Sequence, residues 1–381
     1  MQEARPFFHR VESLRGIGAV MVAGWHVSGW HVNGIALLPH QPWPEAGWLQ
    51  NALGRFELAL LPGHSALMVF FVISGFVLRV SLQYGPQNVA DATVRFHIAR
   101  IFRIYPVVML SMLLSAVAHG WQVPATATQP AAALDAWTII ANLLLLDVSM
   151  NSVLWAIQLE VLMAPVIVAL YFLERWRGPW VLVAIAFITS VLSFDKGWAL
   201  WPPLSHNFFA FVLGMLVPTL GCRLVRALSL PAVHGLLLGV VLCLFLTGAV
   251  LGLFSRFSAF FEGYLAFLLV SIVAYRMEAR GLRILDIKPV RLLGLSSGSY
   301  YVLHMTLLMW IVPMIAMAIP AAWSLQAPAL VGPVVIAVAA AVLSVPSLAS
   351  YYAVEAPGIA LGRRVIAGWR QVPFRPSQTP P

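Results

Sequence analysis

Long hydrophobic runs constrain this chain more than any other feature of its sequence. Of its 381 residues, 61% are hydrophobic and only 10% are charged, a composition typical of a polytopic membrane protein. A helix of about 20 apolar residues crosses the ~30 Å hydrocarbon core of a bilayer. The runs predict an all-α integral membrane protein with about ten transmembrane helices, at residues 13–33, 62–80, 104–121, 152–173, 179–194, 205–221, 231–252, 258–275, 294–319 and 328–351.

The positive charges indicate how these helices are oriented. With both termini in the cytoplasm, all of the 23 Lys and Arg residues except Arg55, Lys196 and Arg256 fall on the cytoplasmic side. Cytoplasmic loops carry such an excess in membrane proteins, so both termini are predicted to be cytoplasmic. The net charge of +9 then reflects topology and predicts no nucleic-acid partner. We expect one transmembrane domain over residues 1–365 and a disordered cytoplasmic tail over 366–381.

Two ionisable residues, Arg15 and His26, lie in the first hydrophobic run. At ~100° and ~1.5 Å per residue they share one helix face and lie ~16 Å apart along its axis. Arg15 would then lie near the cytoplasmic surface, where it suits a phosphate-bearing ligand. His26 would lie near mid-membrane, where an ionisable side chain costs about 2.5–3.5 kcal/mol and is a functional hypothesis by default. It suits proton transfer or nucleophilic attack, and the alternative is a histidine satisfied by a neighbouring helix.

Further ionisable residues lie near the cytoplasmic side. Arg100 and Arg103 share a helix face at the start of the third run, where paired guanidinium groups can hold phosphates. Anchoring to lipid headgroups is the alternative. Glu160 is the only acidic residue expected well inside a span. It should pair with a cation such as Arg15 or orient His26.

Other polar residues favour structural roles on the sequence alone. Ser74 and Gly75 favour close packing of a neighbouring helix, with a catalytic serine as the less favoured interpretation. His64 is expected in a solvated position on the outer side, and Glu355 in an ion pair at a cytoplasmic helix end. His304 lies about a third of the way into the ninth run. The sequence has no metal-ligand spacing and no phosphate-binding loop, so no metal is expected.

Five segments, taken in order, resemble the signatures of the membrane acyltransferase-3 family, whose members acylate bacterial surface glycans. They are Arg15-x10-His26, Phe70-F-V-I-S-G-Phe76, Arg100-I-F-R-I-Y-Pro106, Leu154-W-A-I-Q-L-Glu160 and Ser299-Y-Y-V-L-His304. Each segment alone is a weak signal, but their order across nearly the whole chain is specific. The chain departs from the family pattern at Val161, at Met163-Ala164 and at Ser297-Gly298, which puts the acceptor pocket in question.

The resemblance implies an O-acyltransferase that uses acetyl-CoA as its acyl donor. Arg15, Arg100 and Arg103, together with Ser74 and His304, would bind the donor. The acceptor would be a hydroxyl of a cell-surface polysaccharide or of its lipid-linked precursor, and the protein would lie in the bacterial cytoplasmic (inner) membrane. A homo-oligomer is compatible with this interpretation.

The same resemblance also implies roles for His26 in the first predicted span and for Glu160. His26 would act as general base or accept the acyl group itself. Glu160 would fix the tautomer of His26 or neutralise Arg15. The rival functions are a proton-coupled transporter or flippase of a lipid-linked sugar, in which His26 and Glu160 form a proton relay, and a multi-span sensor without turnover.

Overall fold

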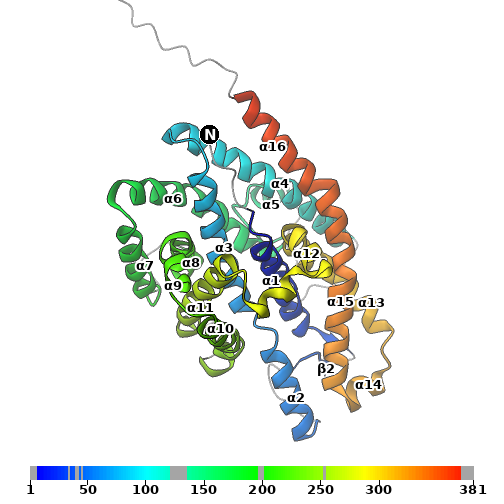
Figure 1. Ribbon diagram of the computed structural model, residues 1–381. Helices are drawn as coiled ribbons and strands as arrows, with labels where there is room; N and C mark the ends of the chain where they lie inside the picture. Colours follow the sequence, from blue (N-terminus) through cyan, green and yellow to red (C-terminus); the bar gives the residue numbers. More distant parts are fainter. Residues whose placement is uncertain are drawn as a thin grey trace, which may run out of the picture.

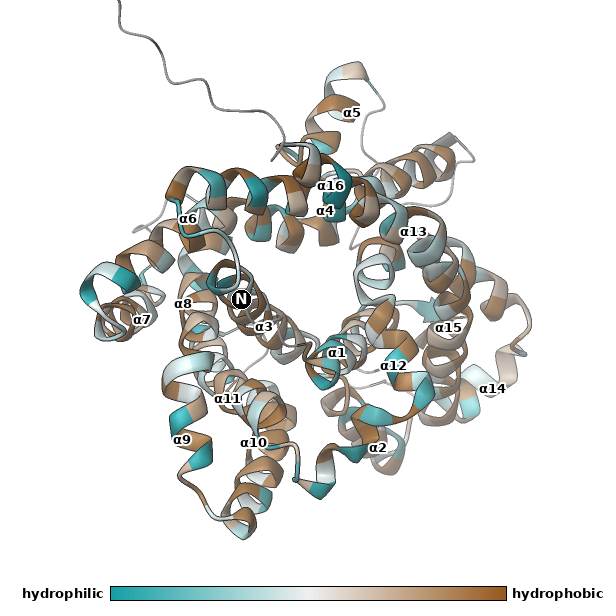
Figure 2. Cartoon of the chain, turned by 45° about the horizontal axis from the view of Figure 1, so that its top comes forward, coloured by the Kyte–Doolittle hydropathy of each residue, from teal (hydrophilic) through white to brown (hydrophobic). Residues whose placement is uncertain are grey.

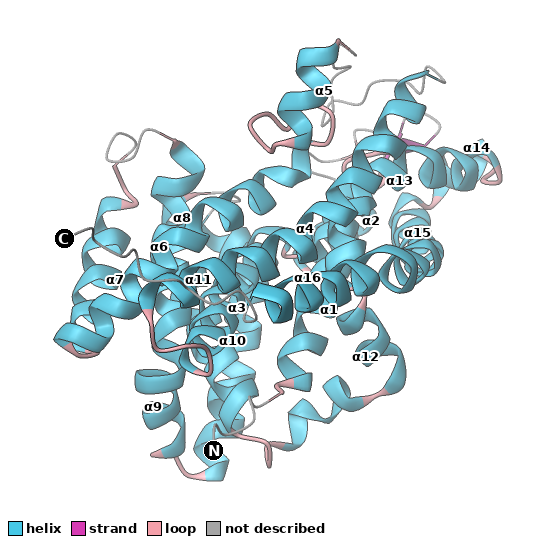
Figure 3. Ribbon diagram, turned by 90° about the horizontal axis from the view of Figure 1, so that it is seen from above, coloured by secondary structure: helices cyan, strands magenta, loops and turns pink. Residues whose placement is uncertain are grey.

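The described part of the chain is almost entirely helical (Figures 1 and 3). The computed structural model describes residues 7–32, 35–38, 43, 46–120, 135–195, 201–251 and 255–369. A short antiparallel hairpin, β1 (His31–Val32) and β2 (Ile35–Ala36), follows the first helix. The all-α fold class expected from the hydrophobic runs is therefore confirmed.

The helices, in chain order, include several short or non-α segments that join the long ones. They are α1 (His9–Ser28), α2 (Trp48–Ala59), α3 (Gly63–Gln83), α4 (Val89–Gly120), α5 (Ala136–Leu143), η1 (Ser152–Leu154), α6 (Trp155–Arg177), α7 (Trp180–Leu192), α8 (Pro202–Leu216), η2 (Val217–Gly221), α9 (Cys222–Arg226), α10 (Leu230–Leu251), α11 (Arg256–Tyr275), η3 (Arg280–Asp286), α12 (Lys288–Leu295), α13 (Ser297–Met317), α14 (Ala321–Gln326), α15 (Pro328–Ser350), η4 (Tyr351–Glu355) and α16 (Ala356–Trp369).

Several helix boundaries follow from local chemistry. The side chain of Asp135 accepts a hydrogen bond from Thr138 N at 2.7 Å and caps α5, and Ser255 caps α11 in the same way. Such caps satisfy backbone donors that have no partner within the helix. Gly178 ends α6 at φ +85°, a backbone conformation that residues with a Cβ rarely adopt.

Eight helices in the described part of the chain are long and apolar enough to cross a membrane. They match eight of the expected runs, with α2 and α3 counted as one segment, Trp48–Gln83. The other two expected runs correspond to α1 and α7. Helix α1 has the length of a span but carries Arg10, Glu12 and Arg15, and α7 has only 13 residues. A multi-pass membrane protein is confirmed, whereas the count of ten spans stays a prediction.

The first helix differs from the expected run in its limits. Helix α1 begins at His9 and ends at Ser28, so His26 lies in its last turn. The apolar residues up to position 32 turn away into the hairpin that starts at His31. Figure 2 shows α1 beside α3, with α8 and α11 on one side of this pair and α13 and α15 on the other. The two helices thus link both halves of the helical bundle.

Glycines allow α3 and α8 to pack backbone against backbone. A Cβ built on Gly75 would lie 2.0 Å from Phe211 O, and one on Gly214 would lie 2.1 Å from Val72 O. Small residues permit this close approach in membranes, where packing rather than the hydrophobic effect drives helix association. The packing role expected for the Ser74–Gly75 step is thus confirmed for Gly75.

We expect Gly75→Val to destabilise the α3–α8 contact, because a side chain there must displace the Phe211 carbonyl. Overpacking of this kind typically costs about 1–3 kcal/mol. The free energy of unfolding in mixed micelles measures it, with Gly239→Val in α10 as the control, since a Cβ at Gly239 meets nothing within 4 Å. Equal stability of the two variants would contradict the close crossing.

Candidate active site

A small internal cavity collects most of the residues singled out from the sequence. Its volume is about 110 Å³, and it lies where α1, α3, α4, α6, α13 and η4 meet. Five of the seven expected site residues line it: Arg15, Ser74, Arg100, Arg103 and Glu160. Tyr301, Ser297 and Glu355 also line it and add further polar groups. We call this space the charged cavity.

Glu160 is fixed by two partners on the wall of the charged cavity. Its Oε1 lies 2.7 Å from Nη2 of Arg100 and accepts a hydrogen bond of 2.5 Å from the Ser74 hydroxyl. The side chains of Arg100 and Glu160 are only 11% and 24% exposed. A carboxylate in the membrane interior needs such neutralisation.

This pairing identifies the partner of Glu160. The sequence favoured either a cation such as Arg15 or an interaction with His26, and the cation is Arg100, which helix α4 brings against α6. Ser74, expected in packing or in donor binding, uses its hydroxyl to hold the carboxylate. Arg100 is therefore largely neutralised and is not equivalent to Arg103 as an anion-binding group.

Arg15 and Arg103 face the same cavity without a fixed partner. Neither guanidinium forms a hydrogen bond, or lies within 4 Å of a carboxylate oxygen, among the residues that the structure describes. Glu12, Glu160 and Glu355 are near enough to Arg15 to attract it electrostatically, and Arg103 repels it. Two neighbouring cations without direct counterions form a site that an anionic ligand can complete.

Glu355 is a site residue for which the sequence favoured a different role. It was expected to pair with a cation at a helix end, but it is 2% exposed, and its Oε2 accepts hydrogen bonds from Ser299 N at 3.1 Å and Ser299 Oγ at 2.8 Å. Ser299 lies in the first turn of α13, where the helix dipole favours a carboxylate. Glu355 lies in the π-helical turn η4, and such turns occur frequently at functional sites. A π-turn leaves no clear mark in a single sequence.

His26 and His304 form a second group beside the charged cavity. Their ring centroids lie 5.3 Å apart with an angle of 37° between the planes, and His304 is fully buried. Neither ring lines the charged cavity, and the donor-binding role expected for His304 stays a prediction. Tyr301 connects the two groups, because it lines the cavity and its ring lies 5.5 Å from that of His304.

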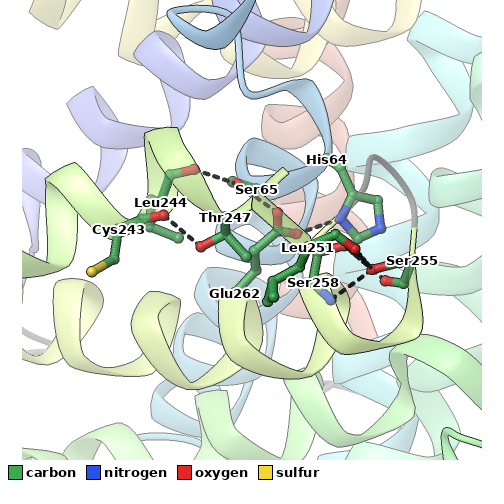
Figure 4. A network of polar contacts seen from close by, with 9 residues as sticks. All are labelled: His64, Ser65, Cys243, Leu244, Thr247, Leu251, Ser255, Ser258 and Glu262. Carbon is green, nitrogen blue, oxygen red and sulfur yellow. Dashed lines mark hydrogen bonds and ion pairs between the residues drawn. The ribbon is translucent and has the colours of Figure 1, made fainter. Parts of the chain in front are cut away.

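A buried acid outside this region corrects two further expectations. Glu262 in α11 is 1% exposed, so Glu160 is not the only acidic residue deep inside a helix of the membrane domain. Its carboxylate pairs with His64 and accepts a 2.9 Å hydrogen bond from Ser65 (Figure 4). His64 was expected to be solvated, yet its side chain is only 18% exposed. Pairing between α3 and α11 makes this carboxylate tolerable.

We expect substitutions of Arg100 and Glu160, the ion pair on the cavity wall, to have non-additive effects on the free energy of unfolding. Arg100→Gln and Glu160→Gln should each lower the free energy of unfolding. Breaking a buried ion pair typically costs about 3–5 kcal/mol. The loss here should lie near the lower end of that range, because Glu160 keeps some exposure. The double variant should recover about 0.5–3 kcal/mol of the summed loss. Unfolding in mixed micelles measures the cycle, with Glu278→Gln as the control because half of that side chain is exposed. Strict additivity would show that the pair does not stabilise the fold.

A comparison with known protein families finds a match over most of the chain. A family model described as an acyltransferase domain matches residues 8–348, and this range contains every motif noted above. No curated protein and no solved structure matches the chain. Because the family match covers most of the chain, the protein belongs to the membrane acyltransferase-3 family.

Proposed function

We propose that this membrane acyltransferase transfers an acetyl group from acetyl-CoA to a hydroxyl of a cell-surface polysaccharide or of its lipid-linked precursor. The observation that supports the donor is the pair of guanidinium groups, Arg15 and Arg103, that face one cavity without a direct counterion. Family membership favours acyl transfer over the rival transporter. The setting we propose is the bacterial cytoplasmic membrane.

The charged cavity suits the narrow part of a coenzyme A molecule. Pockets that enclose a whole ligand usually have about 300–1,000 Å³. The cavity has about 110 Å³, so the pantetheine arm could enter while the nucleotide stays outside. Arg103 is exposed and Arg15 is half-buried, an arrangement that could hold phosphates at the entrance. We therefore assign the phosphates to Arg15 and Arg103, with Arg100 contributing mainly through Glu160.

His26 is our candidate for the group that acts on the acyl carbon or on the acceptor hydroxyl. It lies on the same helix as Arg15, ~16 Å further along the axis by helix rise. A donor held at Arg15 by its phosphates would extend its arm toward His26. A positioned base typically contributes about 10²–10⁴-fold to such a transfer, because a sugar hydroxyl is a poor nucleophile. General-base and acyl-carrier roles both fit this position.

We expect His26→Ala to abolish transfer while leaving coenzyme A binding intact. Purified protein in liposomes would be given radiolabelled acetyl-CoA and a total lipid extract of the host membranes as the source of lipid-linked saccharides. Label in the saccharide fraction should fall by about 10²-fold or more. Calorimetric binding of coenzyme A is the control, and a wild-type transfer rate in the variant would remove His26 from the reaction.

Arg15→Gln and Arg103→Gln should weaken coenzyme A binding instead. A hydrogen bond to a charged group contributes about 1.5–3 kcal/mol, so each change should raise the Kd on the order of tenfold to a hundredfold. Isothermal titration calorimetry in detergent measures it. The exposed Arg364→Gln in α16 is the matched control and should change nothing. Unchanged affinity in both cavity variants would contradict the proposed phosphate site.

A further inference from the structure

His304 has a chemical feature that the donor site does not explain. Its Nδ1 lies 2.6 Å from the carbonyl oxygen of Tyr301, and because a carbonyl only accepts, the hydrogen is on Nδ1. The neutral ring then presents a lone pair at Nε2. That atom is buried and has no hydrogen-bond partner among the described residues. An unsatisfied buried polar atom costs about 1–3 kcal/mol and calls for a reason.

The other imidazole of the site, His26, lies beside the ring of His304. The rings of His26 and His304 are 5.3 Å apart, and no hydrogen bond joins His304 Nε2 to any described residue. Rings at this separation can be bridged by one hydroxyl oxygen at about 2.6–3.2 Å from a nitrogen of each, the reach that proton transfer requires. The separation of the two rings is therefore short enough for both to act on one hydroxyl.

We propose that His304, through Nε2, is the base that takes the proton of the acceptor hydroxyl, while His26 carries the acyl group. This inference rests on the function proposed above and divides its chemistry between two residues. An acylated imidazole is a poor base because the acyl group withdraws electron density from the ring and lowers the basicity of the nitrogen that is left unacylated. If His26 carries the acyl group, a second base is needed. His304 is the neighbouring ring, and its Nε2 has a lone pair without a hydrogen-bond partner among the described residues.

The reaction then has two balanced steps. In the first, a ring nitrogen of His26 forms a bond to the thioester carbon and the carbon–sulfur bond breaks. Coenzyme A leaves as the thiolate and takes the proton that the acylated ring gives up from its other nitrogen. In the second, the acceptor oxygen bonds to the acyl carbon while its proton moves to His304 Nε2. The acyl carbon–nitrogen bond breaks, and His304 passes that proton to the nitrogen of His26.

Burial of His304 supports this division of roles. The ring is fully buried between the helices, which keeps bulk water away from a base that would otherwise promote hydrolysis of the acyl group. The hydrogen bond to Tyr301 also prevents the ring from presenting its N–H side to the substrate. A histidine with a packing role alone would not need a buried Nε2 without a hydrogen-bond partner.

The two half-reactions can be measured separately. Without any acceptor, wild-type protein should exchange radiolabelled coenzyme A into acetyl-CoA, which requires an acyl-enzyme. His304→Gln and His304→Ala should keep this exchange but lower transfer to the host lipid extract by about 10²–10⁴-fold, mainly in kcat. His26→Ala should lose both reactions. The glutamine variant keeps a polar side chain of similar length that cannot act as a base.

His97→Gln is the matched control. Its Nδ1 also contacts a backbone carbonyl of the same helix, Thr93 O at 2.8 Å, and His97 does not line the charged cavity. Both reactions should stay at the wild-type level in this variant. Loss of exchange in both His304 variants would make His304 a structural residue and overturn the proposal, as would undiminished transfer.

The outcomes also separate this inference from the proposed function. Wild-type transfer without exchange would contradict the acyl-histidine and with it the division of roles, while leaving acetyl transfer in place. A wild-type protein that moves no acetyl group from acetyl-CoA to the extract would contradict the proposed function itself. Exchange that persists in His304→Gln while transfer is lost is the one result that supports both.

Discussion

The ion pair between Arg100 and Glu160 determines the electrostatics of the charged cavity. A carboxylate among membrane helices is stable only when a cation or hydrogen-bond donors offset its desolvation, and here α4 supplies the cation and α3 the hydroxyl of Ser74. Side chains from α3, α4 and α6 thereby meet at one oxygen atom, Oε1 of Glu160. Because Arg100 is occupied, the remaining positive charge of the cavity belongs to Arg15 and Arg103. This contact thus separates one cation that has a carboxylate partner from the two that we propose to bind the donor.

Close helix packing determines where the charged side chains of the cavity lie. A Cβ on Gly16 would lie 2.4 Å from Gly294 N, so α1 touches the backbone of α12 directly. Gly298 leaves room for the Glu355 carboxylate, which a Cβ there would meet at 2.9 Å. These small residues allow α1 to pack against α12 and Glu355 to pack against α13. The packing that stabilises the bundle in lipid thus also brings Arg15 and Glu355 into the lining of the charged cavity.

The sequence predicted the elements of the site better than its pairings. Helix rise alone placed Arg15 and His26 on one face, and hydropathy located the spans, since both depend on local sequence. The partner of Glu160 depends on how α4 and α6 are rotated about their axes, which hydropathy does not report. The same holds for Glu262 in α11, whose partner His64 lies on another helix. Glu355 was misjudged because the π-helical turn that directs it inward adds a residue to the helical period.

The arrangement along α1 connects the two chemical regions. Its first half contributes Arg15 to the charged cavity, and its last turn places His26 against His304. Tyr301 stands between them on α13, in contact with the cavity on one side and with the His304 ring on the other. In the function we propose, a donor bound by its charged end at Arg15 would have its reacting carbon near His26, so a thin, flexible chain would have to connect the two. Coenzyme A has this shape, with its phosphates at one end of the pantetheine arm and its thioester at the other.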